Sequence, residues 1–423
     1  MKINLNEVLY AFSLGLDAVE YEFLGIKPGH SKRLAALSII TGKAIGLTDN
    51  ELIDIAAYSI LHDNALTEFN QEEIEYKKYN GGRAYSELDF MIRHCTIGEI
   101  NTKLLPFRTN NRDVILLHHE NADGSGPFRR LAQRTPVKAQ IIHMADMIDT
   151  HFNLLDQSPE NCDAIINYVR ANTGTLFSKE VSDAFCGSFK KKYMKVFAFD
   201  NIDGFLRSSI KHHEDEYTPQ EVRNLATLIA RIIDFKSHYT CKHSLGVATK
   251  AEKMAFHYNY SQEKTIRYYL AGALHDVGKL MIHNSILKKP ARLTDEEYLV
   301  MKNHAYYTHE ILKNLKGMSD ITTWASHHHE KLNGQGYPFG LSAKDLTQEE
   351  RLMTCVDIYQ ALTEERPYKS GFPHQKTIQI MQEMAVNGEL DPSIVEEVNA
   401  VFRFYHLSDQ PSVTEILRAD QIY

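Results

Sequence analysis

Apolar residues along the chain recur with the period of amphipathic helices. One stripe runs from Leu5 to Val19, and another lies in residues 266–274, where Gly278 is placed to end the helix. Residues 218–221, Thr-Pro-Gln-Glu, form a capping-box start with proline at the first helical position. No segment alternates polar and apolar residues over a useful length, so we expect an all-α fold.

The two halves of the chain carry the same motifs in the same order. A His-Ser pair opens a helical segment at His30 and again at His243, and Leu-His-Asp stands at residues 61–63 and 274–276. A single histidine, a two-histidine motif and a later aspartate then recur, each about 210 residues apart. Such a steady offset predicts two tandem domains made by an internal duplication. We place these domains at residues 1–205 and 206–423.

Composition and charge narrow the function classes. The chain of 423 residues has 43% hydrophobic and 24% charged residues, an ordinary globular composition, and no apolar run reaches the length of a membrane span. We expect a cytoplasmic protein without membrane contact. The five cysteines form no Cys-x-x-Cys pair, which indicates neither a disulfide framework nor a thiolate zinc site. A net charge of −8 argues against binding DNA or RNA duplexes, so any anionic ligand needs local cations.

The unusual feature is the 21 histidines, whose arrangement suggests a metal centre. The C-terminal copy places five imidazoles and two carboxylates on separate helical segments: His243, His275, Asp276, His304, His328, His329 and Asp357. Such donors suit two divalent ions such as iron, manganese, nickel or zinc, with Asp276 able to bridge them. A lone His-Asp pair is usually a surface pair or a structural core pair, but structural residues have no physical reason to recur at seven matching positions.

Further motifs follow these residues in a fixed order. They are LHDVGK at 274–279, ILKKPARLTDEEY at 286–298, HHEKLNGQGYP at 328–338, VDIYQALTEERPYK at 356–369 and ELDPSIV at 389–395. Over residues 220–400 the chain thereby resembles the HD-GYP branch of the HD phosphohydrolase superfamily. The resemblance implies an all-helical fold around a metal centre and hydrolysis of a cyclic dinucleotide, either cyclic di-GMP or 3′,3′-cyclic GMP-AMP. The N-terminal copy resembles a diverged member of the same branch.

The resemblance also implies roles for individual residues. One metal would be held by His243, His275, Asp276 and Asp357, and the other by Asp276, His304, His328 and His329. A hydroxide bridging the two ions, iron or manganese with nickel or zinc as alternatives, would attack phosphorus to give the linear dinucleotide. Asp276 and Lys279 are the expected catalytic residues. The expected substrate-binding residues are Lys279, Tyr337, Arg366 and Lys369.

The chain departs from the family pattern in two places. Tyr239 stands where some members carry a glutamate for a third metal, so we expect two ions. The family's DALTS is QALTE at residues 360–364, which removes a carboxylate whose structural role is then in doubt. Neither departure changes the seven expected ligands.

The N-terminal copy keeps a full set of metal-binding residues but loses the substrate-binding groups. Its candidate second metal site is His30, His62, Asp63, His94, His118, His119 and Asp146. The positions equivalent to Lys279, Tyr337, Arg366 and Lys369 are Leu66, Pro127, Leu155 and Ser158. We expect a poor cyclic dinucleotide phosphodiesterase, which leaves a metal-stabilised structural partner, a sensory domain or a hydrolase for a smaller phosphate ester.

Two other functions remain open for the whole protein. A degenerate receptor would bind the cyclic dinucleotide without turnover and signal through a partner. Another HD-type nucleotide phosphohydrolase would not need the Gly-Tyr-Pro and Arg-Pro-Tyr-Lys groups. A homodimer is a further alternative that the sequence leaves open.

Overall fold

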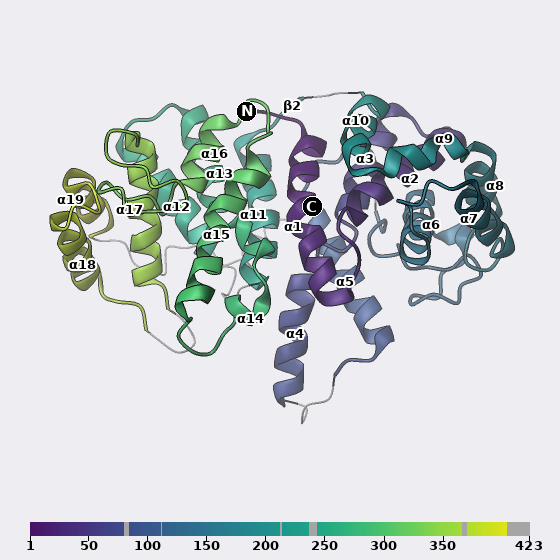
Figure 1. Cartoon of the computed structure of the whole chain (residues 1–423), viewed down its shortest axis with the longest axis horizontal. Helices are drawn as coiled ribbons and strands as arrows, with labels where there is room; N and C mark the ends of the chain where they lie inside the picture. Colours follow the sequence, from purple (N-terminus) through teal and green to yellow (C-terminus); the bar gives the residue numbers. More distant parts are fainter. Residues whose placement is uncertain (80–83, 111, 212–213, 237–242, 366–369, 404–423) are drawn as a thin grey trace. The chain divides into compact units, whose positions relative to one another are not determined.

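The computed structural model of the chain describes residues 1–79, 84–110, 112–211, 214–236, 243–365 and 370–403. The chain divides into two compact units, residues 2–217 and residues from 218 onward. In both units almost all regular structure among the described residues is helical, which confirms the expected all-α class (Figure 1). The division falls after the expected boundary at 205, because a helix that crosses this position packs within the N-terminal unit.

In its described residues the N-terminal unit contains helices of 4 to 20 residues, two short 3-10 helices and one pair of two-residue antiparallel strands. Its elements are β1 (Lys2–Ile3), α1 (Leu5–Leu24), α2 (His30–Ile45), α3 (Asp49–Ile60), α4 (Leu66–Tyr79), α5 (Glu87–Thr102), η1 (Ala132–Arg134), α6 (Val137–His151), α7 (Pro159–Ala171), α8 (Lys179–Ser188), α9 (Lys191–Met194), η2 (Lys195–Phe197), α10 (Phe199–Ser209) and β2 (Asp215–Glu216). Helix α10 packs on α2, and β2 pairs with β1, so both stay with this unit.

The C-terminal unit has helical structure alone among its described residues. Its elements are α11 (Pro219–Lys236), α12 (His243–His257), α13 (Gln262–Leu274), η3 (Val277–Met281), α14 (Asn284–Leu287), α15 (Asp295–Leu312), α16 (Ser319–Ser326), α17 (Gln348–Thr363), α18 (His374–Val386) and α19 (Pro392–Phe402). Helix α12 packs against α13 and α17, α13 against α16, and α16 against α15 (Figure 1). These five helices form the bundle that carries the expected metal ligands.

The predicted helix starts are confirmed where the sequence carries capping residues. Helix α11 begins at Pro219, and the Thr218 hydroxyl accepts a hydrogen bond from the Glu221 amide while the Glu221 carboxylate accepts one from the Thr218 amide. Helix α1 begins at Leu5, where the Asn4 side chain caps the Glu7 amide.

The prediction that Gly278 ends a helix is wrong. Helix α13 already ends at Leu274, and Gly278 lies in the 3-10 helix η3. A Cβ at Gly278 would collide with the His304 carbonyl and lie 2.5 Å from the Thr308 amide nitrogen on α15. The Gly278 amide donates to Thr308 Oγ1 at 3.0 Å, and this hydroxyl donates to the His275 carbonyl at 2.9 Å. The glycine is therefore required for the close contact that holds α15 beside the His275-Asp276 turn.

None of the helices in the described parts of the chain combines the length and the apolar character that crossing a lipid bilayer requires.

Replacing Gly278 with alanine should destabilise the C-terminal unit, because the added methyl group meets backbone atoms that cannot move aside. We expect a loss of about 3 kcal/mol in the free energy of unfolding, measured by urea denaturation of the full chain. The matched control is Gly204→Ala on the exposed side of α10, where a Cβ meets no atom within 4 Å and should be neutral or stabilising. Equal denaturation of Gly278→Ala and the wild type would contradict the close contact.

Candidate metal centre

The seven expected ligands of the C-terminal unit come from the ends and middles of its bundle helices. His243 is the first residue of α12, and the His275-Asp276 pair directly follows α13. His304 lies within α15, and Asp357 lies within α17. His328 and His329 lie in the turn after α16. Segments separated by more than 100 residues therefore converge on one point inside the unit.

The Asp276 carboxylate stands between two groups of imidazoles. Its Oδ2 atom lies 3.1 Å from His275 Nε2 and 3.7 Å from His243 Nε2. Its Oδ1 atom lies 3.4 Å from His304 Nε2 and 4.0 Å from His328 Nε2. Each carboxylate oxygen thus faces its own set of nitrogen donors, which is the arrangement that a bridging ligand of two ions requires.

Asp357 completes the first group and reaches toward the second. Its Oδ1 atom lies 3.3 Å from His243 Nε2 and 3.6 Å from His275 Nε2. Its Oδ2 atom lies 4.0 Å from His329 Nδ1. All seven sequence-predicted ligands of this unit are therefore brought together.

Backbone carbonyls orient three of the imidazoles. The Nδ1 atoms of His275, His304 and His328 lie 2.7, 2.7 and 2.6 Å from the carbonyl oxygens of Gly272, Met301 and Ala325. Because a carbonyl only accepts, each ring carries its proton on Nδ1 and directs the lone pair of Nε2 into the centre.

The interior of the centre contains polar atoms that the protein itself does not satisfy. His275 Nε2 and Asp276 Oδ1 are fully buried and have no hydrogen-bond partner among the described residues. Leaving such atoms unpaired costs about 1–3 kcal/mol each. Divalent transition ions would satisfy them, because the available donors are imidazole nitrogens and carboxylate oxygens. The residues present therefore fit a metal centre.

Burial sets the protonation of three of these imidazoles. It lowers the pKa of His304 to about 4 and that of His329 to about 3, and it also lowers the pKa of His328, so these rings stay neutral at pH 7. For His243 burial alone would lower the pKa, but hydrogen bonds to Asp357 and Glu364 outweigh it and raise the pKa to about 10. Burial alone would raise the pKa of Asp357, but the hydrogen bond with His243 and the nearby His275 imidazole hold this pKa far below its usual value.

Glu364 is a residue that the sequence analysis missed. Its Oε2 atom lies 2.9 Å from His243 Nδ1 and orients the imidazole. In the N-terminal unit Asp149 performs this task, at 2.6 Å from His30 Nδ1, and the equivalent position in the C-terminal unit is Gln360. The carboxylate that seemed lost from QALTE is thus supplied one helical turn later. Glu364 lies four residues after Gln360, a spacing that places two side chains on the same face of a helix, and this was the signal in the sequence that could have identified it.

The residues around position 360 also differ from those around the equivalent Asp149 in the N-terminal unit. Arg33 pairs with Asp149 in the N-terminal unit, whereas its equivalent in the C-terminal unit is Gly246. Gln360 fills the space, since a Cβ on Gly246 would lie 2.5 Å from the Gln360 side chain. Gln360 in turn accepts a hydrogen bond from the buried Lys250 at 2.5 Å.

The expected substrate groups are in place where the structure describes them. Lys279 Nζ lies 2.5 Å from Asp276 Oδ2, and its side chain is 19% exposed. The Tyr337 ring lies 4.7 Å from the His329 ring, between centroids, and its amide donates to the His329 carbonyl. Arg366 and Lys369 lie outside the described residues, as does Tyr239.

A buried glutamate and two glycines shape the loop that carries Tyr337. The Glu330 carboxylate accepts hydrogen bonds from the amides of Phe339 and Leu341 at 2.7 and 2.8 Å. Gly334 has a φ of +75°, and a Cβ on Gly336 would lie 2.5 Å from Glu330 Cα. The loop therefore closes tightly beside the expected metal ligands His328 and His329.

The N-terminal unit repeats this geometry with its own residues. Asp63 Oδ2 lies 3.6 Å from His62 Nε2, and Asp63 Oδ1 lies 3.5 and 3.7 Å from the Nε2 atoms of His94 and His118. Asp146 links the remaining two rings, at 3.5 Å from His30 Nε2 and 3.9 Å from His119 Nδ1. The seven residues of the candidate second site are thus also gathered.

The positions equivalent to the substrate groups are occupied differently in the N-terminal unit. Leu66 is buried at the start of α4, Leu155 is 47% exposed, and Ser158 caps the Asn161 amide of α7. None of these side chains, nor that of Pro127, can offer a positive charge to a phosphate.

Comparison with known proteins finds similarity to the C-terminal unit and to the fold of the whole chain. A model of the HD domain matches residues 226–394, the part of the chain that carries the C-terminal centre. A crystal structure titled as that of cyclic GMP-AMP specific phosphodiesterases in Vibrio cholerae has a TM-score of 0.66, with 22% sequence identity, and the match covers 96% of this chain and 99% of that chain. The fold of both units is therefore shared with that structure.

Curated relatives extend the match. The 3′3′-cGAMP-specific phosphodiesterase 1 of Vibrio cholerae is 26% identical over 98% of this chain and 95% of its own length. A cyclic di-GMP phosphodiesterase of Pseudomonas aeruginosa is 31% identical over 43% of this chain and 44% of its own length. The resemblance that the motifs indicated is confirmed to this extent: residues 226–394 match the HD domain, and the chain is similar to proteins named as phosphodiesterases of cyclic dinucleotides.

Proposed function

We propose that this protein is a metal-dependent phosphodiesterase that opens a cyclic dinucleotide to the linear dinucleotide at the C-terminal centre. The observation that carries the proposal is the Asp276 carboxylate, whose two oxygens face separate groups of buried nitrogen donors. A carboxylate that served only the fold would not need two sets of imidazoles around it. A carboxylate that bridges two ions of a hydrolytic centre needs one set for each ion.

Two ions would divide the seven residues as the resemblance implies. His243, His275, Asp276 and Asp357 would hold one, and Asp276, His304, His328 and His329 the other. When bound, such a pair supplies an activated water for in-line attack on phosphorus and neutralises charge on the attacking and leaving oxygens. The donor types suit iron or manganese, with nickel or zinc as alternatives.

The other residues of the centre serve the substrate. Lys279 presents a compact positive charge beside Asp276, where it can neutralise a phosphate oxygen as charge develops in the transition state. Tyr337 stands next to His329 and offers a ring face for a base or a hydroxyl for a phosphate. A protein with a net charge of −8 depends on such local groups to hold a doubly anionic ligand.

We assign the substrate as 3′,3′-cyclic GMP-AMP in preference to cyclic di-GMP. Two relatives that match most of this chain, over 98% and 81% of its length, are both named 3′3′-cGAMP-specific phosphodiesterases. The relatives named for cyclic di-GMP match at most 43% of the chain. Both units together are therefore shared with enzymes named for the mixed nucleotide.

We assign Glu364 as a positioning residue. It accepts the Nδ1 proton of His243 and so fixes the tautomer that directs Nε2 toward Asp357 and Asp276. Without this acceptor the imidazole could rotate or carry its proton on Nε2, and the donor would be lost.

Replacing the His275-Asp276 pair by alanine should abolish hydrolysis, because one change removes a terminal ligand and the other removes the bridge. We expect a fall of about 1,000-fold or more in kcat/KM for 3′,3′-cyclic GMP-AMP, with a smaller content of bound metal by elemental analysis. Cyclic di-GMP should be turned over more slowly than 3′,3′-cyclic GMP-AMP by the wild type.

The matched control is the double alanine variant of His62 and Asp63 in the N-terminal unit. It should keep most of the cyclic dinucleotide hydrolysis, since this unit lacks the cations for the substrate. A fully metallated wild type without turnover of either substrate would contradict the enzyme and favour the receptor. Loss of turnover in the His62 and Asp63 variant, with turnover kept in the His275 and Asp276 variant, would show that the active site lies in the N-terminal unit.

Replacing Glu364 by alanine should weaken metal binding without removing a ligand. We expect the metal affinity, measured by competition with a chelator, to fall by about 10- to 100-fold, and Glu364→Gln to recover part of this loss because its amide oxygen can still accept the His243 proton. The neighbouring exposed residue supplies the control, Glu365→Ala. Equal affinities for the Glu364→Ala and Glu365→Ala variants would contradict the positioning role.

A further inference from the structure

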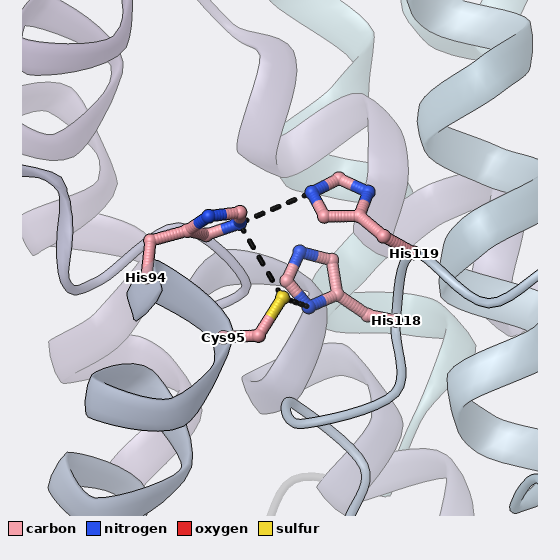
Figure 2. Close-up of side chains that lie close together, drawn as sticks. All are labelled: His94, Cys95, His118 and His119. Carbon is pink, nitrogen blue, oxygen red and sulfur yellow. Dashed lines mark hydrogen bonds between the residues drawn. The ribbon is translucent and has the colours of Figure 1, made fainter. Parts of the chain in front are cut away.

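The N-terminal centre contains a cysteine that the mechanism does not use. Cys95 follows His94 on α5 and is completely buried. Its Sγ atom lies 3.5 Å from His94 Nε2 and 3.6 Å from His118 Nδ1. Figure 2 shows the side chains of His94, Cys95, His118 and His119 converging from two segments of the chain, with the sulfur next to a nitrogen of His94 and a nitrogen of His118.

The donor atoms of these four residues are gathered closely enough to surround one ion. They all lie within 4.8 Å of one another, and His119 Nε2 is 3.1 Å from His94 Nε2. With metal–nitrogen and metal–sulfur bonds of about 2.0–2.3 Å, neighbouring donors of a tetrahedral site lie roughly 3.3–3.7 Å apart. The separation of the Cys95 sulfur from His94 Nε2 falls in this range.

Unsatisfied polar atoms mark the same place independently. His118 Nε2 and Asp63 Oδ1 are fully buried and lack a hydrogen-bond partner among the described residues. His118 Nδ1 lies 2.6 Å from the Ile115 carbonyl, so the ring proton is on Nδ1 and the lone pair of Nε2 is available. A cation bound by the three imidazoles and the thiolate would satisfy His118 Nε2.

The C-terminal unit shows what the cysteine adds. There the position equivalent to Cys95 is Ala305, which is also buried, beside His304 with its partners His328 and His329. The two clusters otherwise contain the same imidazoles and the same carboxylate. The sulfur is therefore an addition to a donor set that is complete without it in the C-terminal unit.

We propose that Cys95 is a thiolate ligand of a metal site in the N-terminal unit, shared with the imidazoles of His94, His118 and His119. Binding of a divalent ion releases the thiol proton to solvent and leaves sulfur as a direct ligand. A thiolate makes this site softer than the nitrogen and oxygen site of the C-terminal unit, and so favours zinc over manganese.

The added ligand also changes what the N-terminal site can do. Three imidazoles and one thiolate fill a tetrahedral shell, which is the closed coordination of structural zinc sites, whereas hydrolytic sites keep a position open for water. This assignment goes beyond the proposed phosphodiesterase activity and gives the N-terminal unit a site that stabilises its fold.

Cobalt substitution tests the ligand directly. The full-length protein is stripped with a chelator and reloaded with Co²⁺ alone, and its absorption spectrum is recorded together with its cobalt content. A thiolate bound to Co²⁺ gives a near-ultraviolet charge-transfer band that imidazole and carboxylate ligands do not give. We expect this band in the wild type, its loss in Cys95→Ala, and at least about a 10-fold lower cobalt affinity of the N-terminal site in that variant.

Two further variants keep the test decisive. Cys162→Ala removes another buried cysteine of the same unit and should retain the band. Ala305→Cys places sulfur beside His304 and should add a second equivalent of the band. A wild type without the band, or a band that persists in Cys95→Ala, would overturn the proposal. Hydrolysis is measured separately, in the variants of the C-terminal unit. A result that excludes Cys95 as a ligand is therefore distinct from a result that excludes the proposed phosphodiesterase activity.

Discussion

The structure depends on the burial of charged carboxylates inside helical bundles. Asp276 is 2% exposed and Asp63 is 8% exposed, and a buried carboxylate is tolerated only with strong compensation. Asp276 lies near imidazoles from four different helices or turns, and Asp63 near imidazoles from three. The helices must therefore meet at fixed distances, which close contacts such as that of Gly278 with α15 provide.

Similar helical arrangements in the two units surround two chemically different centres. In the C-terminal unit Lys279 and Tyr337 adjoin the ligands, so the centre is equipped to receive an anionic substrate. In the N-terminal unit these groups are absent and a cysteine joins the cluster instead. By our proposals, the same arrangement of residues would serve hydrolysis in the C-terminal unit and hold an ion in the N-terminal unit.

Residues that contact the candidate ligands keep the orientation of the imidazoles when neighbouring residues differ between the two units. The first histidine of each set is oriented by a carboxylate, from Asp149 in one unit and from Glu364 in the other. In the C-terminal unit Gln360 and Lys250 then fill the space that Asp149 and Arg33 occupy in the N-terminal unit. Such paired changes preserve the direction of the imidazole while altering the residues around it.

The sequence by itself determined the helical class, the helix starts at capping residues, the order of the candidate ligands along the chain and the lack of the candidate substrate cations in the N-terminal copy. These features are local, because capping, periodicity and residue type act over a few positions. Only the tertiary structure decided that Glu364 replaces a carboxylate at position 360, that Gly278 serves packing instead of ending a helix, and that Cys95 reaches the ligands beside it. Each of these depends on distances between segments far apart in the chain, which local patterns do not encode.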